Sequence, residues 1–570
     1  MNRNDLFRAM LFVATLILSL GFPIHGTGAG TAIAHSEPVA QEAIATAIST
    51  PTAPLFDNLG DHHHPISTRN ALTQRYFDQG LVLAYGFNHA EALRSFRQAA
   101  ELDPSCAMCY WGIAYVVGPN INAAMEESEV PTAWDAVQKA VQLSSNANER
   151  DRAYIHALAT RYTPEPVEDR TELNLAYANA MREVARQYPN DPDAVTLFAE
   201  ALMDTTPWAY WDESGKPTEA GAEIISTLES VLERFPNHVG ALHLYIHAVE
   251  AQRPELAADV ADRLRDLNIQ TSHLLHMPAH IYLRVGRYHD AVVANQRAVA
   301  ADAEYLRTHH PEGIFRIAYM PHNYHFLWYS AMMAGQRQEA VAAARNTADL
   351  VERSLLREPG YGTLQHYAVI PLYTSVKFGL WDEILAEPKP EADLVYPTGV
   401  WHFARGMALA AKGEVQAATQ ELKALKAIAA DPALDGVTIW DINTTADLLK
   451  IGVEVLSGEI AAKRGDVYRA IAHLEDAVAL QDQLHYDEPA PWYSPVRQNL
   501  GAVLLQAGRP VEAEQVFRDD LAIYPNNGWS LYGLAQSLDA QGKTAEAQQV
   551  RAQFRAAWRH ADVTLTSARF

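Results

Sequence analysis

The apolar and small residues of this chain recur with a fixed period between about Leu72 and Trp558, and no segment there has a convincing strand pattern. The clearest element of the period is a glycine followed five residues later by an alanine. It occurs at Gly286/Ala291, Gly335/Ala340, Gly413/Ala418, Gly465/Ala470, Gly508/Ala513 and Gly542/Ala547. The last two pairs lie 34 residues apart, and Leu500 and Leu534 repeat at the same distance.

Each position of this period has a physical role in a pair of helices. A glycine between two helices ends the first one in the left-handed conformation without a Cβ penalty. An alanine lets the second helix approach the first closely, and a proline such as Pro525 closes the unit. The pattern therefore predicts an all-α chain of about ten to twelve helix pairs, whose first helices line a concave groove.

Three segments interrupt the period and are predicted to be loops. Residues 163–171 and 205–217 carry too many prolines for a helix. Residues 485–495 (HYDEPAPWYSP) are an insertion, which stretches the spacing from Gly465 to Gly508 to 43 residues.

The period and its small residues resemble the tetratricopeptide repeat over most of residues 72–558. Several motifs also resemble a subgroup of exported bacterial repeat proteins: HHHPIST (62–68), CAMCYWGIA (106–114), HMPAHIYLRVGRYHDA (276–291), MPHNYHFLWYSA (320–331) and WYSPVRQNLGAVLLQAGRP (492–510). The family resemblance implies a tetratricopeptide-type α-solenoid that docks peptides or partner proteins in its groove. The subgroup resemblance implies no particular activity.

The amino terminus predicts export. Arg3 and Arg8 precede an apolar run from Met10 to Phe22, which is too short to span a bilayer, and Ala32-Ile33-Ala34 fits a cleavage site. We expect a signal peptide over residues 1–34, with an uncleaved anchor as the alternative, and a mature protein that is periplasmic or extracellular. A flexible lead-in (35–70), irregular repeats (71–271), central repeats with a His-rich groove (272–450), regular repeats (451–560) and a tail (561–570) follow.

Composition narrows the choice of partners. The 45 Lys and Arg against 69 Asp and Glu give a net charge of −24, which argues against nucleic acid and anionic lipid. No later segment is apolar enough for a membrane span. Nucleophile-elbow, P-loop and dinucleotide motifs are all missing from the sequence.

Histidines gather in the middle of the chain, with eleven of the 23 between His238 and His325. Aligning the repeats places seven side chains on the groove faces of neighbouring first helices: His243, His247, Glu250, His276, His280, His322 and His325. Imidazoles on adjacent helices can meet one ion, and His-x-x-x-His followed by a carboxylate suits Cu, Fe or Zn. The alternative is that these residues line a groove for an organic ligand. Pro278 predicts that the helix starts near Met277, with His273 in the preceding loop.

The repeat pattern also assigns positions to four aromatic residues, two cysteines and one further histidine. Trp111, Tyr115, Trp529 and Tyr532 fall at groove positions and are candidate ligand contacts. Cys106 and Cys109 open a helix; a local disulfide, two buried thiols and a redox pair are the three interpretations. His402 falls off the groove and is expected to be structural.

Two functions from different classes remain. One is an exported binding module whose groove holds a peptide, partner protein or small ligand. The other is a metal-binding protein or metalloenzyme whose centre is built from groove histidines. The sequence does not decide between them, and whether the protein is an enzyme stays open.

Overall fold

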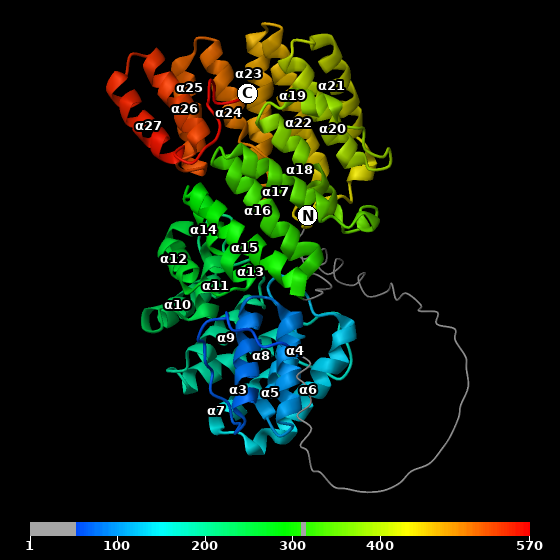
Figure 1. Cartoon of the computed structure of the whole chain (residues 1–570), viewed down its shortest axis with the longest axis vertical. Coiled ribbons are helices and arrows are strands. Elements are labelled where there is room, and N and C mark those ends of the chain that lie inside the picture. The colour runs from blue at the N-terminus through cyan, green and yellow to red at the C-terminus, as the bar shows by residue number, and fades with distance from the viewer. Residues whose placement is uncertain (1–52, 309–314) are drawn as a thin grey trace, which may run out of the picture.

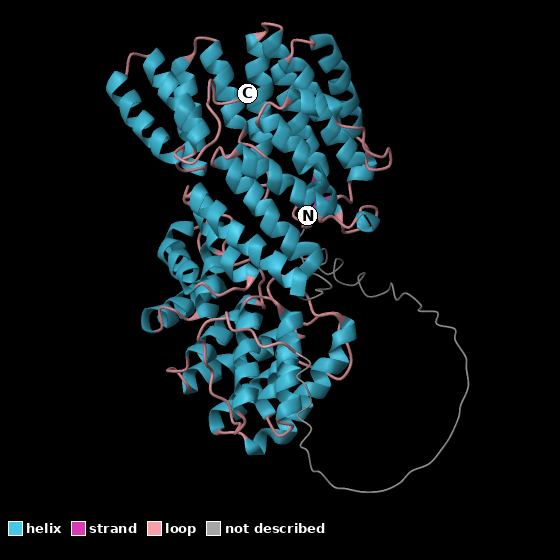
Figure 2. Ribbon diagram, in the orientation of Figure 1, coloured by secondary structure: helices cyan, strands magenta, loops and turns pink. Residues whose placement is uncertain are grey.

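The computed structural model describes residues 53–308 and 315–570, and within them the chain is almost entirely helical (Figure 2). The predicted signal peptide lies outside these residues. Consecutive helices pack against one another along the chain and form an elongated solenoid, which runs from α3 at one end toward α27 at the other (Figure 1). The predicted all-α solenoid is confirmed.

The helices form three stretches with the following bounds. The first comprises α3 (Ala71–Tyr85), α4 (His89–Leu102), α5 (Ala107–Val116), α6 (Val130–Leu143), α7 (Glu149–Ala159), α8 (Thr171–Gln187), α9 (Pro192–Met203), α10 (Glu219–Arg234), α11 (Val239–Val249) and α12 (Ala258–Leu267). The second comprises α13 (Ser272–His276), α14 (Pro278–Arg284), α15 (Tyr288–Thr308), α16 (Met320–Met333), α17 (Arg337–Asp349), α18 (Gly362–Lys377), α19 (Trp381–Ala386), α20 (Val395–Ala411) and α21 (Val415–Ala429). The third comprises α22 (Thr445–Lys463), α23 (Val467–Asp482), α24 (Val496–Gln506), α25 (Pro510–Ile523), α26 (Gly528–Ala540) and α27 (Thr544–Ala557).

A few short elements complete the chain. A two-residue antiparallel pair, β1 (Thr438–Ile439) with β2 (Asn443–Thr444), forms where no strand was predicted. Single turns of helix occur at η1 (Glu127–Glu129), η2 (Ser144–Asn146), η3 (Pro254–Ala257), η4 (Phe315–Tyr319), η5 (Arg353–Leu355) and η6 (Pro432–Leu434). None of the described helices is long and apolar enough to cross a membrane.

The Gly/Ala spacing has the structural role that the sequence predicts. All six of its glycines adopt positive φ, between 70° and 82°. All six of its alanines are fully buried where the second helix of a pair meets the first. The three predicted loops also lie outside the α-helices, apart from Thr171, which begins α8, so helix boundaries follow the sequence pattern closely.

The C-terminal repeats fold back onto the central helices. The Trp529 indole Nε1 in α26 donates to the Met332 carbonyl at 3.1 Å, and the Asp562 carboxylate accepts from the backbone N–H groups of Arg337 and Gln338 at 2.6 and 2.9 Å. This closure brings the loop between α23 and α24 onto α14.

The lead-in before α3 is held in place where the structure describes it. The Tyr76 hydroxyl donates to the Ala53 carbonyl at 2.8 Å, and the Gln270 N–H donates to the Asn58 carbonyl at 3.0 Å. Ile66 is buried. Residues 53–70 are therefore packed on the helices, which differs from the flexible segment expected there, because their apolar side chains have helix surface to cover.

Candidate metal centre

Six histidines meet where the central helices and α11 face each other. They form two neighbouring triads, which we call triad A (His243, His247 and His273) and triad B (His276, His280 and His322). Within each triad the potential ligand atoms lie within 4.8 Å of one another. The rings of His247 and His280, one from each triad, have centroids only 5.7 Å apart, so the triads adjoin.

Helical spacing positions most of these side chains. His243 and His247 are four residues apart on α11 and share one face, with Glu250 at the end of that helix. His273 and His276 lie on α13, and His280 lies on α14. Met277 joins the two helices with helical angles (φ −50°, ψ −37°), so the path does not break before Pro278.

His273 thus lies in a helical turn rather than in a loop, and it completes triad A. Pro278 occupies the first position of α14, where its missing N–H costs nothing. The expectation of a loop at His273 was wrong because a proline interrupts the hydrogen-bond ladder without ending the helical course of the backbone.

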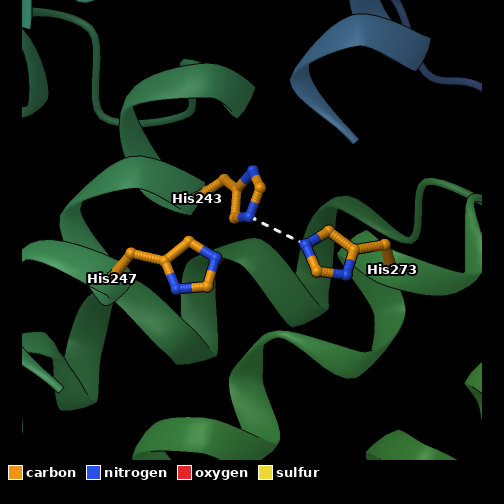
Figure 3. A group of neighbouring side chains, drawn as sticks. All are labelled: His243, His247 and His273. Carbon is orange, nitrogen blue, oxygen red and sulfur yellow. Dashed lines mark hydrogen bonds between the residues drawn. The ribbon is translucent and has the colours of Figure 1, made fainter. Parts of the chain in front are cut away.

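Triad A is closely packed. His243 Nε2 and His273 Nε2 are 3.1 Å apart, and the ring centroids of His243 and His247 are 4.8 Å apart. Figure 3 shows His243 and His247 from one helix facing His273 across a common space. All three side chains are buried, and the aromatic rings of Phe87 and Trp208 cover them.

Triad B has the same kind of contact. His276 Nε2 lies 2.9 Å from His280 Nε2, and the His322 ring from α16 is 5.0 Å from the His276 ring by centroids. Phe326 packs against all three rings. His276 and His280 are buried and His322 is half-buried.

Several imidazoles donate a hydrogen bond from Nδ1 to an oxygen atom, on the side of the ring away from the triad. The His243 Nδ1–H donates to the Tyr85 carbonyl at 2.6 Å, and the His276 Nδ1–H donates to Asn295 Oδ1 at 2.7 Å. Asn295 donates its amide to the Ala291 carbonyl at 2.8 Å, which fixes its oxygen toward the histidine. With the proton on Nδ1, each Nε2 presents a lone pair to its triad.

Two carboxylates connect the triads. Glu250 Oε1 lies 3.3 Å from His247 Nδ1, and its Oε2 lies 3.1 Å from His280 Nδ1. Glu488, from the loop after α23, places Oε2 2.7 Å from His280 Nδ1. Glu250 accepts a hydrogen bond from His247 Nδ1, and both carboxylates lie within ion-pair distance of His280 Nδ1, which leaves Nε2 of each histidine to face its triad.

The pKa of His280 is shifted in the opposite direction from the pKa of four other triad histidines. Burial, reinforced by neighbouring histidines, lowers the pKa of His243, His273, His276 and His322 well below the usual value. Burial also acts to lower the pKa of His280, but Glu250 and Glu488 outweigh it and raise the pKa to about 10. Most of the cluster is therefore neutral, as metal ligation requires.

Other predicted site residues lie elsewhere. His325 is buried outside both triads, stacked on Trp328 with ring centroids 5.0 Å apart, and its ring is 5.6 Å from His366. His402 contacts Glu421 at 2.5 Å, away from the centre. Trp111, Tyr115 and Trp529 are buried and offer almost no surface to a ligand, whereas Tyr532 is half-buried.

The His-His-His segment before α3 approaches a different carboxylate. Asp193 accepts from His64 Nδ1 at 2.8 Å and from the Tyr85 hydroxyl at 2.6 Å, while His62 Nε2 and His238 Nε2 each lie 3.1 Å from it. His238 Nδ1 accepts from the Ala241 N–H at 3.1 Å, so its Nε2 carries the proton and bonds Asp193. This cluster ties the lead-in to α9 and supplies no ligand to the triads.

The C-terminal helices match models of a known repeat family. Models of the tetratricopeptide repeat match residues 452–526 and 504–553. Over residues 452–553 the chain is therefore similar to tetratricopeptide repeats. Tetratricopeptide repeats generally serve as scaffolds that bind other proteins through their extended concave surfaces. No curated protein sequence matches the chain.

Several solved structures are similar at low identity. A chain of the Cut9–Hcn1 hetero-tetramer of the APC/C is 14% identical over 86% of this chain and 74% of its own, with a TM-score of 0.28. Human IFIT1, in a dimer with PPP-AAAA, is 12% identical over 87% and 92%, with a TM-score of 0.27. The P58(IPK) TPR domain is 12% identical over 86% and 98%, with a TM-score of 0.24. Scores this low carry no argument about function.

Proposed function

We propose that this protein binds two transition-metal ions, one in each histidine triad. One observation carries the proposal. In each triad two imidazole Nε2 atoms lie 2.9 or 3.1 Å apart inside a buried site, and in triad B both rings have their Nδ1 directed at oxygen acceptors. Two lone pairs at this separation repel, so a proton or a metal ion must lie between the two nitrogens.

The spacing suits a metal ion. At a metal–nitrogen bond of about 2.0–2.1 Å, two neighbouring ligand nitrogens are about 2.9 Å apart in octahedral and about 3.3 Å apart in tetrahedral geometry. A proton on His280 can bridge to His276 in metal-free protein, and a metal ion displaces it. The carboxylate behind His247 and His280 is the outer partner that metal-bound histidines usually have.

The donor set narrows the metal and its chemistry. Imidazole suits Cu, Zn, Fe and Ni, and three protein ligands leave coordination positions for water or a substrate. Such positions are typical of catalytic rather than closed structural sites. We therefore propose Cu, Fe or Zn, in a centre that can bind an external molecule.

Titration with Co²⁺ tests the proposal. Chelator-treated protein should develop ligand-field absorption that saturates at about two equivalents, one for each triad. His247→Ala should remove about one equivalent and His276→Ala the other, whereas His402→Ala should bind like wild type. Saturation below about half an equivalent, or equal losses in the His402 variant, would contradict the proposal.

A second proposal concerns location. The amino-terminal pattern of basic and apolar residues, and motifs that resemble those of exported bacterial repeat proteins, support export to the periplasm or beyond. The Cys106–Cys109 disulfide in the structure suits an oxidising compartment. Fractionation of cells followed by N-terminal sequencing should find a mature chain that begins near His35; a cytosolic full-length chain would contradict export.

The repeats also support the binding of a peptide or partner protein, which we propose as a separate function of the C-terminal region. Of the predicted groove aromatics only Tyr532 retains open surface. A photo-crosslinking residue at Tyr532 should trap a partner in cells, and the same residue at the exposed Tyr468, 84% accessible, serves as the control. Equal yields at the two positions would contradict a groove at Tyr532.

A further inference from the structure

A small cavity lies beside the metal centre, against the loop that carries Glu488. Its volume is about 160 Å³. Five of the seventeen residues that line it are aromatic: Tyr288 of α15, Tyr329 of α16, Tyr486, Trp492 and Tyr524. A cavity of about 150 Å³ holds one benzene molecule, so this partly open space has about the volume of a single six-membered ring.

One end of the cavity is polar. Arg284 Nε and Glu488 Oε1 are 3.8 Å apart, which is beyond hydrogen-bond distance. Both atoms are buried, and neither has a hydrogen-bond partner of good geometry among residues 53–308 and 315–570. Arg284 is held in place by its Nη2, which donates to the Ala251 carbonyl at 3.2 Å, and by the Tyr486 ring 5.2 Å from its guanidinium carbon.

A donor and an acceptor at this separation can share one hydroxyl group. A hydroxyl oxygen placed at about 2.8 Å from each atom accepts from Arg284 Nε and donates to Glu488 Oε1. A carboxylate could accept from Arg284 but would face the Glu488 oxygens, acceptor against acceptor. The polar end therefore selects a neutral hydroxyl over an acid.

We propose that this cavity binds a small phenol, with its ring among the aromatic side chains and its hydroxyl between Arg284 and Glu488. This inference rests on the proposed metal function. It extends that function because Glu488 Oε2, at the polar end of the cavity, lies 2.7 Å from His280 Nδ1 of triad B. The phenol hydroxyl is thus separated from His280 of triad B by one carboxylate. The protein would use this position to hold a hydroxylated aromatic molecule next to its metal ions.

Calorimetric titration with phenol and with anisole tests the proposal on the full chain, both chelator-treated and metal-loaded. Anisole has the same ring but cannot donate to Glu488. Since a hydrogen bond to a charged group contributes substantially, phenol should bind about tenfold to hundredfold more tightly than anisole in both preparations. Arg284→Met should abolish this preference, and Arg345→Met, which changes an exposed arginine on α17, should keep it.

Each outcome bears on one proposal. Equal affinities for phenol and anisole in wild type, or no detectable binding of phenol, would overturn the inference even if Arg284→Met fails to fold. Binding of phenol only to metal-loaded protein would also overturn it, because the molecule would then ligate the metal directly. Phenol selectivity in a protein that takes up no metal would support the cavity and contradict the metal centre alone.

Discussion

Glu250→Gln is the substitution that probes the link between the two triads. Glu250 is 1% exposed, and its two oxygens lie 3.3 Å from His247 Nδ1 and 3.1 Å from His280 Nδ1. Glutamine has almost the same shape but only one acceptor oxygen, so one histidine will face an –NH₂ group, donor against donor. Loss of such an outer partner weakens metal binding by about tenfold to hundredfold, or about 1.4–2.7 kcal/mol.

Competition with a chelator of known affinity measures this loss for each ion. We expect the ion whose histidine faces the –NH₂ group of Glu250→Gln to bind more weakly by this amount, and the ion whose histidine keeps the amide oxygen to lose less, while circular dichroism stays unchanged. Glu421→Gln is the matched control, since Glu421 holds His402 in the same kind of pair at 2.5 Å but away from the centre. The reasoning is refuted if Glu250→Gln keeps wild-type affinity, or if Glu421→Gln loses as much.

Two further predictions concern packing and pH. A Cβ added at Gly533 would lie 2.2 Å from the Phe517 ring, so Gly533→Ala should lower the free energy of unfolding by about 1–3 kcal/mol in thermal melts. Gly436→Ala, with nothing within 4 Å, should destabilise far less, and equal losses would contradict the packing. Burial and Asp204 raise the pKa of Glu200 to about 7, so the folded protein holds a proton that the unfolded chain releases near pH 4.5. The contribution of Glu200 to stability should therefore fall as pH rises from about 4.5 to 7, so the free energy of unfolding of wild type relative to Glu200→Gln should drop by about 1–3 kcal/mol over this range; identical pH profiles would contradict it.

The fold was predictable because its determinants are local and repeated. Gly508 and Ala513 specify a turn and a close helix contact through their own backbone and size, and Gly542 and Ala547 repeat them 34 residues later. The fold-back of the chain was not predictable in this way. It depends on contacts such as Trp529 with Met332, which join residues far apart in sequence and have no periodic signal.

The candidate centre was predictable in part. Spacing on α11 and alignment of the repeats pointed to five of the six triad histidines, and whether they bind metal stays a prediction. His273 was set aside because Pro278 suggested a loop. Glu488 was missed because it comes from an inserted loop that reaches His280 only when the C-terminal repeats fold back. The insertion itself was the available signal, since it breaks an otherwise regular period.

The metal content of the untagged protein tests the central claim most directly. Wild type and His247→Ala should be purified without chelators from cells grown with Cu, Fe and Zn supplied, and analysed by inductively coupled plasma mass spectrometry. The account predicts about two equivalents of transition metal in wild type and about one in the variant, in line with the two triads. Less than about a tenth of an equivalent of any transition metal in folded wild type would contradict it, and the histidines would then be the lining of a site for an organic ligand.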